Sequence, residues 1–143
     1  APALKCIGFY GTYTYTHTKV NNFNCEGREN EKDLSLPGSP EHTANTSLYF
    51  EKKGFNVRLS YNYASSFIDE MGEVAALDRY YDAVNYMDLN ASYTFGKKIK
   101  TTFYADATNL LNQPLRYYQG VKDRTMQSEH YGVKINAGVK VNF

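Results

Sequence analysis

Apolar and polar residues alternate with a period of two along the last thirteen positions of the chain. From Tyr131 to Phe143 every second residue is apolar or aromatic, and the positions between them hold glycine, lysine or asparagine. This period predicts a β-strand with one apolar and one polar face. At about 3.3 Å per residue the strand would be roughly 43 Å long, well beyond the ~17–20 Å of an ordinary globular strand.

The same alternation recurs in five segments upstream. They cover about residues 5–19, 44–51, 55–64, 87–95 and 99–108. Short glycine-containing turns at 52–54 and 96–98 join two pairs of these strands as hairpins. The other three connections, 20–43, 65–83 and 109–130, are long and are predicted to be loops. The chain is therefore predicted to be all-β, with about six long antiparallel strands in three hairpins.

Short and long connections alternate strictly, which places every long loop at one end of the predicted sheet. Membrane β-barrels sort their connections in this way, whereas a soluble Greek-key sandwich has no reason to do so. One face of the strands carries charges of both signs, which excludes it as a packed core; cross-strand pairing of these charges is expected. They are Arg58, Asp88, Lys100, Asp106, Lys134 and Lys140. No second apolar layer remains in the sequence, so lipid is the simplest partner for the opposite face.

Six strands are too few for a closed membrane barrel, which needs about eight. An open sheet would leave unpaired strand edges in lipid, where unsatisfied backbone groups are not tolerated. Either the chain is a fragment of a larger barrel, or copies of it pair edge to edge. The first residues show no secretory leader and run almost directly into a strand. We therefore expect a C-terminal piece of a longer protein.

Composition narrows the functional classes. Sixteen basic and fifteen acidic residues give a net charge of +1, so no charge argument favours a nucleic-acid partner. No apolar run approaches the ~20 residues of a transmembrane helix. Fourteen Tyr and eight Phe residues with no Trp favour β structure and surfaces that are half apolar and half hydrated.

The sequence resembles the C-terminal barrel strands of TonB-dependent outer-membrane receptors of the type abundant in Bacteroidetes. The resemblance covers the chain from about Phe9 onwards and rests on three stretches. These are residues 36–45 with 51–55 and 58–63, residues 109–120, and the terminal alternating strand that closes on Phe143.

The resemblance implies that residues 1–143 are the last strands of a 22-stranded transmembrane barrel in the bacterial outer membrane. It implies a plug domain and a TonB contact supplied by parts of the receptor that this chain lacks. The implied function is active uptake of a scarce small-molecule ligand such as a siderophore, glycan, cobalamin or peptide. The terminal strand is implied to be the signal that the barrel-assembly machinery recognises, carried here by Tyr131, Val139, Val141 and Phe143.

Long loops rich in Tyr, Asn and charge are where such a receptor would meet its ligand. The preferred candidates are Arg79, Tyr80, Tyr81, Arg116, Tyr117 and Tyr118. The last three are the strongest, because two aromatics and a guanidinium can stack on a sugar or a chelate. Further loop candidates are Phe23, Arg28, Glu29, Phe67, Asp69, Glu70, Lys122 and Arg124. The alternative for each of them is a solvated loop surface or an interfacial girdle.

No catalytic constellation, cofactor signature or metal-ligand spacing is present, so we expect neither an enzyme nor a metalloprotein. Cys6 and Cys25 fall near opposite ends of the first strand, more than about 40 Å apart. A disulfide needs about 6 Å between α-carbons, and none is predicted within one chain. Two rival functions remain: a β-sheet module that assembles edge to edge, and a passive porin-type barrel.

Overall fold

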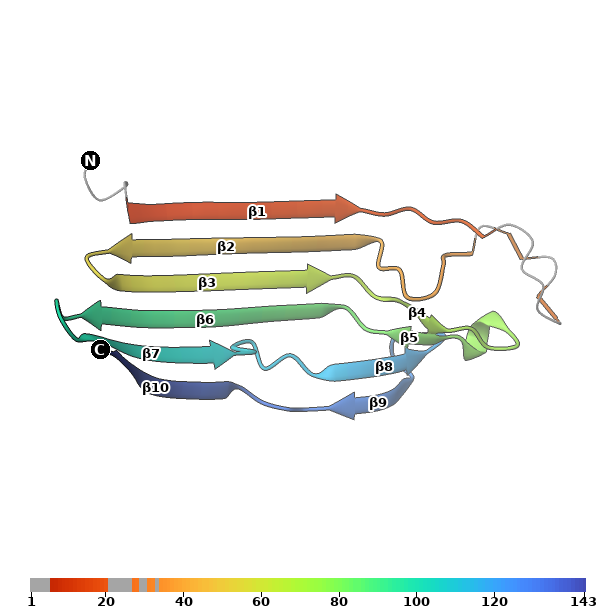
Figure 1. Ribbon diagram of the computed structural model, residues 1–143. Coiled ribbons are helices and arrows are strands. Elements are labelled where there is room, and N and C mark those ends of the chain that lie inside the picture. The colour runs from red at the N-terminus through yellow and green to blue at the C-terminus, as the bar shows by residue number, and fades with distance from the viewer. Residues whose placement is uncertain (1–5, 21–26, 29–30, 33) are drawn as a thin grey trace.

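The computed structural model of the protein describes residues 6–20, 27–28, 31–32 and 34–143. The six long strands form one antiparallel sheet in the order β1-β2-β3-β6-β7-β10, laid side by side in Figure 1. The strands are β1 (Ile7–Tyr15), β2 (His42–Lys52), β3 (Phe55–Ala64), β6 (Val84–Phe95), β7 (Lys100–Thr108) and β10 (Lys134–Asn142). The all-β, antiparallel fold predicted from the alternation is confirmed.

The register of the main sheet places the predicted apolar residues of all six strands on one face. Residues directly opposite each other in neighbouring strands point to the same side of a sheet. One such row across the sheet is entirely apolar and reads Phe9, Leu48, Leu59, Leu89, Ala107 and Ile135. The adjacent row faces the other way and reads Gly8, Tyr49, Arg58, Asn90, Asp106 and Asn136. A one-residue slip anywhere would mix the two rows.

The charges of the polar face do not pair with one another as expected. No ion pair joins Arg58, Asp88, Lys100, Asp106, Lys134 and Lys140, all of which lie in the described part of the chain. Hydrogen bonds tie this face together instead: the Asn90 amide donates to Asp106 over 2.8 Å, and the Asp88 carboxylate accepts the backbone N–H of Asn109 over 2.9 Å. Asp88 and Asp106 of this face therefore accept from neutral donors instead of pairing with its cations.

The main sheet has no covering layer among the residues that the structure describes. Within the described residues the buried side chains are Arg28, Ile68, Asp78 and Tyr118, and none of them belongs to the six long strands. On the apolar face Phe9 and Ile135 are each 71% exposed. The sheet is also open, with β1 and β10 at its edges (Figure 1). No helix in the described ranges is long and apolar enough to cross a bilayer.

The terminal strand is shorter than predicted. It runs from Lys134 to Asn142 rather than from Tyr131. Gly132 has a φ of +75°, which interrupts the extended backbone, and its carbonyl accepts a hydrogen bond from the Asn109 side chain over 3.2 Å. Nine residues at about 3.3 Å each still rise ~23 Å at a ~40° tilt, close to the ~25 Å apolar band of a membrane barrel.

Two of the predicted loops contain strands that the alternation does not reveal. Residues 65–83 and 109–133 contribute a second antiparallel sheet, in the order β4-β5-β8-β9, which we call the loop sheet. Its strands are β4 (Phe67–Glu70), β5 (Arg79–Tyr81), β8 (Leu115–Gln119) and β9 (Thr125–Glu129), with a short 3-10 turn, η2 (Ala75–Leu77), before β5. The loop sheet lies beyond the long-loop ends of β3, β6 and β7 (Figure 1). The count of six strands therefore left out these four short ones, which lie within connections predicted to be loops.

A turn at residues 109–113, the junction turn, links the two sheets. Asn109 and Asn112 have φ values of +57° and +51°, a conformation that asparagine tolerates better than most residues. The Asn109 side-chain oxygen accepts the Gln113 N–H over 2.8 Å, and the Gln113 side chain accepts the N–H of Asn85 over 3.2 Å. The junction turn thereby fixes where the chain leaves β7 of the main sheet and enters β8 of the loop sheet.

The first long loop is described only in part. Phe23, Cys25 and Glu29 lie outside the described residues, so the prediction about Cys25 has no structural counterpart. Cys6 is a free thiol at the start of β1. Arg28 is described and is buried, as set out below.

Candidate functional site

The loop sheet brings the six preferred candidates together on two neighbouring strands. In β5 and β8, Tyr80 pairs with Tyr118 and Tyr81 with Tyr117, while Arg79 lies opposite Gln119. The two motifs are more than thirty positions apart in sequence. Because side chains alternate along a strand, the register divides the candidates between two faces of the loop sheet.

One face, the buried face, is used for packing. The Tyr80 and Tyr118 rings stack with centroids 5.0 Å apart and planes 3° from parallel. Tyr118 is 5% exposed and Ile68, paired with Tyr80 from β4, is 7% exposed. The Arg116 guanidinium lies over the Tyr118 ring at 5.8 Å. Tyr118 therefore has little surface left for a ligand.

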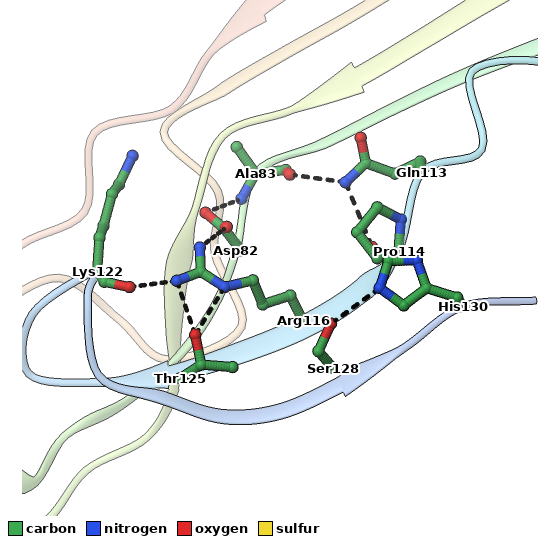
Figure 2. A network of polar contacts seen from close by, with 9 residues as sticks. All are labelled: Asp82, Ala83, Gln113, Pro114, Arg116, Lys122, Thr125, Ser128 and His130. Atoms are coloured by element: carbon green, nitrogen blue, oxygen red, sulfur yellow. Dashed lines mark hydrogen bonds and ion pairs between the residues drawn. The ribbon is translucent and has the colours of Figure 1, made fainter.

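Arg116 is fully engaged by its own chain. Its guanidinium donates to the Asp82 carboxylate over 2.6 Å and, through Nε and Nη2, to the Thr125 hydroxyl over 3.2 and 3.0 Å. It also donates to the Lys122 carbonyl. Figure 2 shows the guanidinium enclosed by these three residues. Arg116 holds the β8–β9 turn against the end of β5, and the predicted ligand contact of Arg116 stays a prediction.

The other face, the open face, carries Phe67, Arg79, Tyr81 and Tyr117. The Tyr81 ring contacts Phe67 at 5.4 Å and meets Tyr117 edge to face at 5.2 Å. The Arg79 guanidinium lies 5.5 Å from the centre of the Tyr117 ring, and its side chain is 40% exposed. This is a half-buried aromatic platform with a cation at its rim, suited to stacking on a sugar ring or a planar chelate.

Carboxylates from β4 orient Arg79. Its Nε and Nη2 donate to Asp69 over 2.8 and 2.6 Å, and its Nη1 lies 2.8 Å from Glu70. The hydrogen bonds with Asp69 are the largest cause of the raised pKa of Arg79. Asp69 and Glu70 therefore serve the open face as counter-charges. In the described residues no group of three His, Cys, Asp or Glu side chains is placed to hold a metal ion.

A buried ion pair joins the first long loop to the loop sheet. Arg28 and Asp78 are each 1% exposed. The Arg28 guanidinium meets the Asp78 carboxylate at 2.5 and 3.1 Å and also donates to Glu31 over 2.6 Å and to the Gly72 carbonyl over 3.1 Å. Its hydrogen bond to Asp78, ahead of that to Glu31, raises the pKa of Arg28. Arg28, a loop candidate from sequence, is thus inaccessible to a ligand.

Burial raises the pKa of two tyrosines in β5. Desolvation is the main cause for both Tyr80 and Tyr81, and it acts with the neighbouring Tyr86 to raise the pKa of Tyr81 to about 12. The neutral phenol is favoured in the folded state, whereas the unfolded chain titrates near pH ~10. The stabilisation is therefore complete below pH ~10 and is lost as pH rises towards ~12.

An alkaline titration tests this arrangement. Tyrosinate absorbance is expected to rise in two stages, the first around the ~10 of an ordinary phenol and the second near pH ~12 from Tyr81. Hydrogen exchange in β5 should accelerate only in the second stage. Tyr81→Phe removes a phenol without removing the ring and should diminish the late stage. A wild-type titration with one midpoint near pH ~10 would contradict the burial of Tyr81.

The remaining candidates lie at the margins of the loop sheet. Lys122 and Arg124 sit in the exposed β8–β9 turn, where Arg124 donates to the Ala76 carbonyl over 3.4 Å. Two residues that matter were missed from sequence: Asp78 and Asp82, the carboxylates that immobilise Arg28 and Arg116. Their position in the sequence could have identified them, because they directly flank the Arg79–Tyr81 motif at both ends.

Comparison with known proteins gives a match to a protein family. Residues 5–110 match the family described as "TonB dependent receptor-like, beta-barrel". The matched range includes β1 to β7 and leaves out β8, β9 and β10. No curated protein and no solved structure matches the chain.

Proposed function

The chain belongs to the TonB-dependent receptor-like β-barrel family, and on that basis we propose that it forms part of the wall of an active-transport receptor for a scarce nutrient. Membership of this family supports a role as a receptor or transporter in the outer membrane. The finer proposal is that a siderophore, glycan or similar small molecule meets the long-loop end and that TonB supplies the energy for its uptake.

One observation carries this proposal: the six long strands share a single unbroken apolar face. Its central row holds no polar side chain on any strand, and no other part of the described chain covers it. Lipid satisfies such a face. The open edges at β1 and β10 are then completed by the remainder of the barrel, since unpaired edges are not stable in lipid.

We place the ligand contact on the open face, at Arg79, Tyr81 and Tyr117. These residues combine partial exposure with aromatic surface and a cation. Tyr80, Arg116 and Tyr118 lie on the buried face, on the opposite side of the same two strands. The proposed role is recognition, because the open face offers aromatic rings for stacking and a cation beside them.

The C-terminal strand supports the proposed assembly signal. Val139 and Val141 lie on the apolar face, opposite Phe103 and Thr101. Phe143 follows them and is fully exposed, and Tyr131 precedes the strand at 75% exposure. We propose that the assembly machinery reads these residues while β10 is still an unpaired edge.

An uptake experiment separates the active receptor from its rivals. We expect deletion of the full-length gene to abolish growth on a limiting nutrient, and the wild-type gene to restore growth only in cells with functional TonB. Restoration in TonB-deficient cells would indicate a passive porin. A full-length product that stays in the aqueous fraction and forms concentration-dependent oligomers would indicate the edge-pairing module. Tyr117→Ala should weaken uptake more than Lys122→Ala, an exposed control on the same sheet margin.

A further inference from the structure

The near-zero net charge of the chain conceals a strong asymmetry of charge between the long-loop end and the short-turn end of the main sheet. The three long connections, residues 16–41, 65–83 and 109–133, contain twelve acidic and seven basic residues. The short-turn end, made of residues 51–54, 96–100 and 140, contains six lysines and one acidic residue. We call this end the lysine rim; it consists of Lys52, Lys53, Lys97, Lys98, Lys100 and Lys140.

The two short turns that carry most of the lysine rim are held side by side. Lys53 and Gly54 both have positive φ, +48° and +82°, as a two-residue hairpin turn requires. The Gly54 carbonyl accepts the N–H of Thr94 over 2.8 Å, and a side chain at Gly54 would come within 2.2 Å of the Thr94 carbonyl oxygen. Lys52 and Lys53 are therefore adjacent to the turn that bears Lys97 and Lys98.

The lysines of the rim are available to a partner. All six are exposed, and none of them takes part in any of the ion pairs of the described residues. Three arginines of the long-loop end, Arg28, Arg79 and Arg116, differ in that each is bound to a carboxylate. Unpaired like charges held together repel one another, so this end gains from an anionic neighbour.

An aromatic belt lies on the apolar face directly beside the lysine rim. Phe50 meets Phe55 edge to face at 6.1 Å, and Phe95 stacks on Tyr93 at 5.8 Å and on Phe103 at 5.9 Å. Lys52 pairs with Phe55 in the register and so shares the face of the belt. Aromatic rings prefer the headgroup level of a bilayer, and lysine stems extend along apolar surface to place their ammonium groups in water.

We propose that four lysines of the rim, Lys52, Lys53, Lys97 and Lys98, bind the anionic headgroups of phospholipids in the leaflet that surrounds the short turns. Lys100 and Lys140 lie on the polar face, away from the lipid. This inference rests on the proposed membrane function. The belt sets the depth of the sheet in the bilayer, and the rim then lies at the level of the lipid phosphates. The acidic long-loop end would be repelled by the same lipids, so the charge asymmetry also favours one orientation of the strands across the membrane.

The test uses the full-length protein in two kinds of vesicle, phosphatidylcholine alone and phosphatidylcholine with a minor share of phosphatidylglycerol. Association of spin-labelled phosphatidylglycerol is compared with that of spin-labelled phosphatidylcholine. We expect wild-type protein to prefer phosphatidylglycerol, and Lys97→Gln/Lys98→Gln to reduce the preference by roughly fivefold for each lysine removed. High salt should reduce it as well. The matched control, Lys32→Gln/Lys122→Gln at the long-loop end, should leave the preference unchanged.

Insertion is scored separately by heat-modifiable mobility on gels. Protein that inserts without a lipid preference, or whose preference survives Lys97→Gln/Lys98→Gln, overturns the lipid-binding inference and leaves the transport proposal standing. An acidic protein partner would then be the remaining explanation of the rim. Protein that fails to insert into either kind of vesicle overturns the membrane function itself.

Discussion

Replacing Leu59 by arginine is expected to destabilise the full-length protein in a bilayer by about 2–4 kcal/mol, the cost of a guanidinium near the midplane of a membrane barrel. Leu59 is the fifth residue of the ten in β3 and lies between Leu48 and Leu89 in the apolar row. An arginine there would face hydrocarbon with no carboxylate in the row to pair with. Denaturant unfolding in phosphatidylcholine vesicles measures the loss.

Ser60→Arg is the matched control for Leu59→Arg. Ser60 is the next residue of the same strand, at the same depth, but it faces Ser47 and Asp88 on the polar side. The new cation would meet water and a carboxylate, so the free energy of unfolding should change by less than about 1 kcal/mol. Equal losses for the two variants would mean that the apolar row does not face lipid.

Removal of the Arg28 side chain is expected to loosen the loop sheet. Arg28→Ala would leave Asp78 as an unpaired buried carboxylate and would free Glu31 and the Gly72 carbonyl. Breaking a buried pair from one side typically costs about 3–5 kcal/mol. Amide hydrogen exchange in β4 and β5 should accelerate by roughly two to three orders of magnitude, while exchange in β2 and β3 should not change.

An exposed ion pair of the same sheet provides the comparison. Glu70→Gln removes a carboxylate that is 65% exposed and bound to Arg79, and exposed pairs contribute about 0–1 kcal/mol. Exchange in β4 and β5 should then rise less than about tenfold. If Arg28→Ala has as small an effect as Glu70→Gln, the first loop is not anchored through Asp78.

The main sheet could be predicted from sequence because its strands are long. Nine to twelve residues give the alternation enough repeats to identify a strand and its apolar face, and the observed register joins those faces without exception. The error at the C-terminus has a local cause. Tyr131 and Val133 fit the alternation, but Gly132 between them takes a positive φ that no hydrophobic pattern reveals.

The loop sheet could not be predicted in the same way. Its strands have three to five residues, too few for a period, and they are defined by partners that lie far away in the chain. The aromatic and arginine motifs of β5 and β8 stood out as candidates by residue type. Their separation into a buried and an open face depends on the pairing of Tyr80 with Tyr118, and the structural role of Arg116 depends on Asp82.

The loop sheet has a consequence for exchanging specificity between receptors. Arg28 in the first connection contacts Asp78 in the second, and β5 of the second pairs with β8 of the third. A graft that replaced a single connection would separate Arg28 from Asp78 or a strand of the loop sheet from its pairing partner. The grafted protein would then misfold. The three connections therefore form one structural unit, and the junction turn is a suitable boundary for exchanging it. Recombination that preserves function should exchange all three connections together.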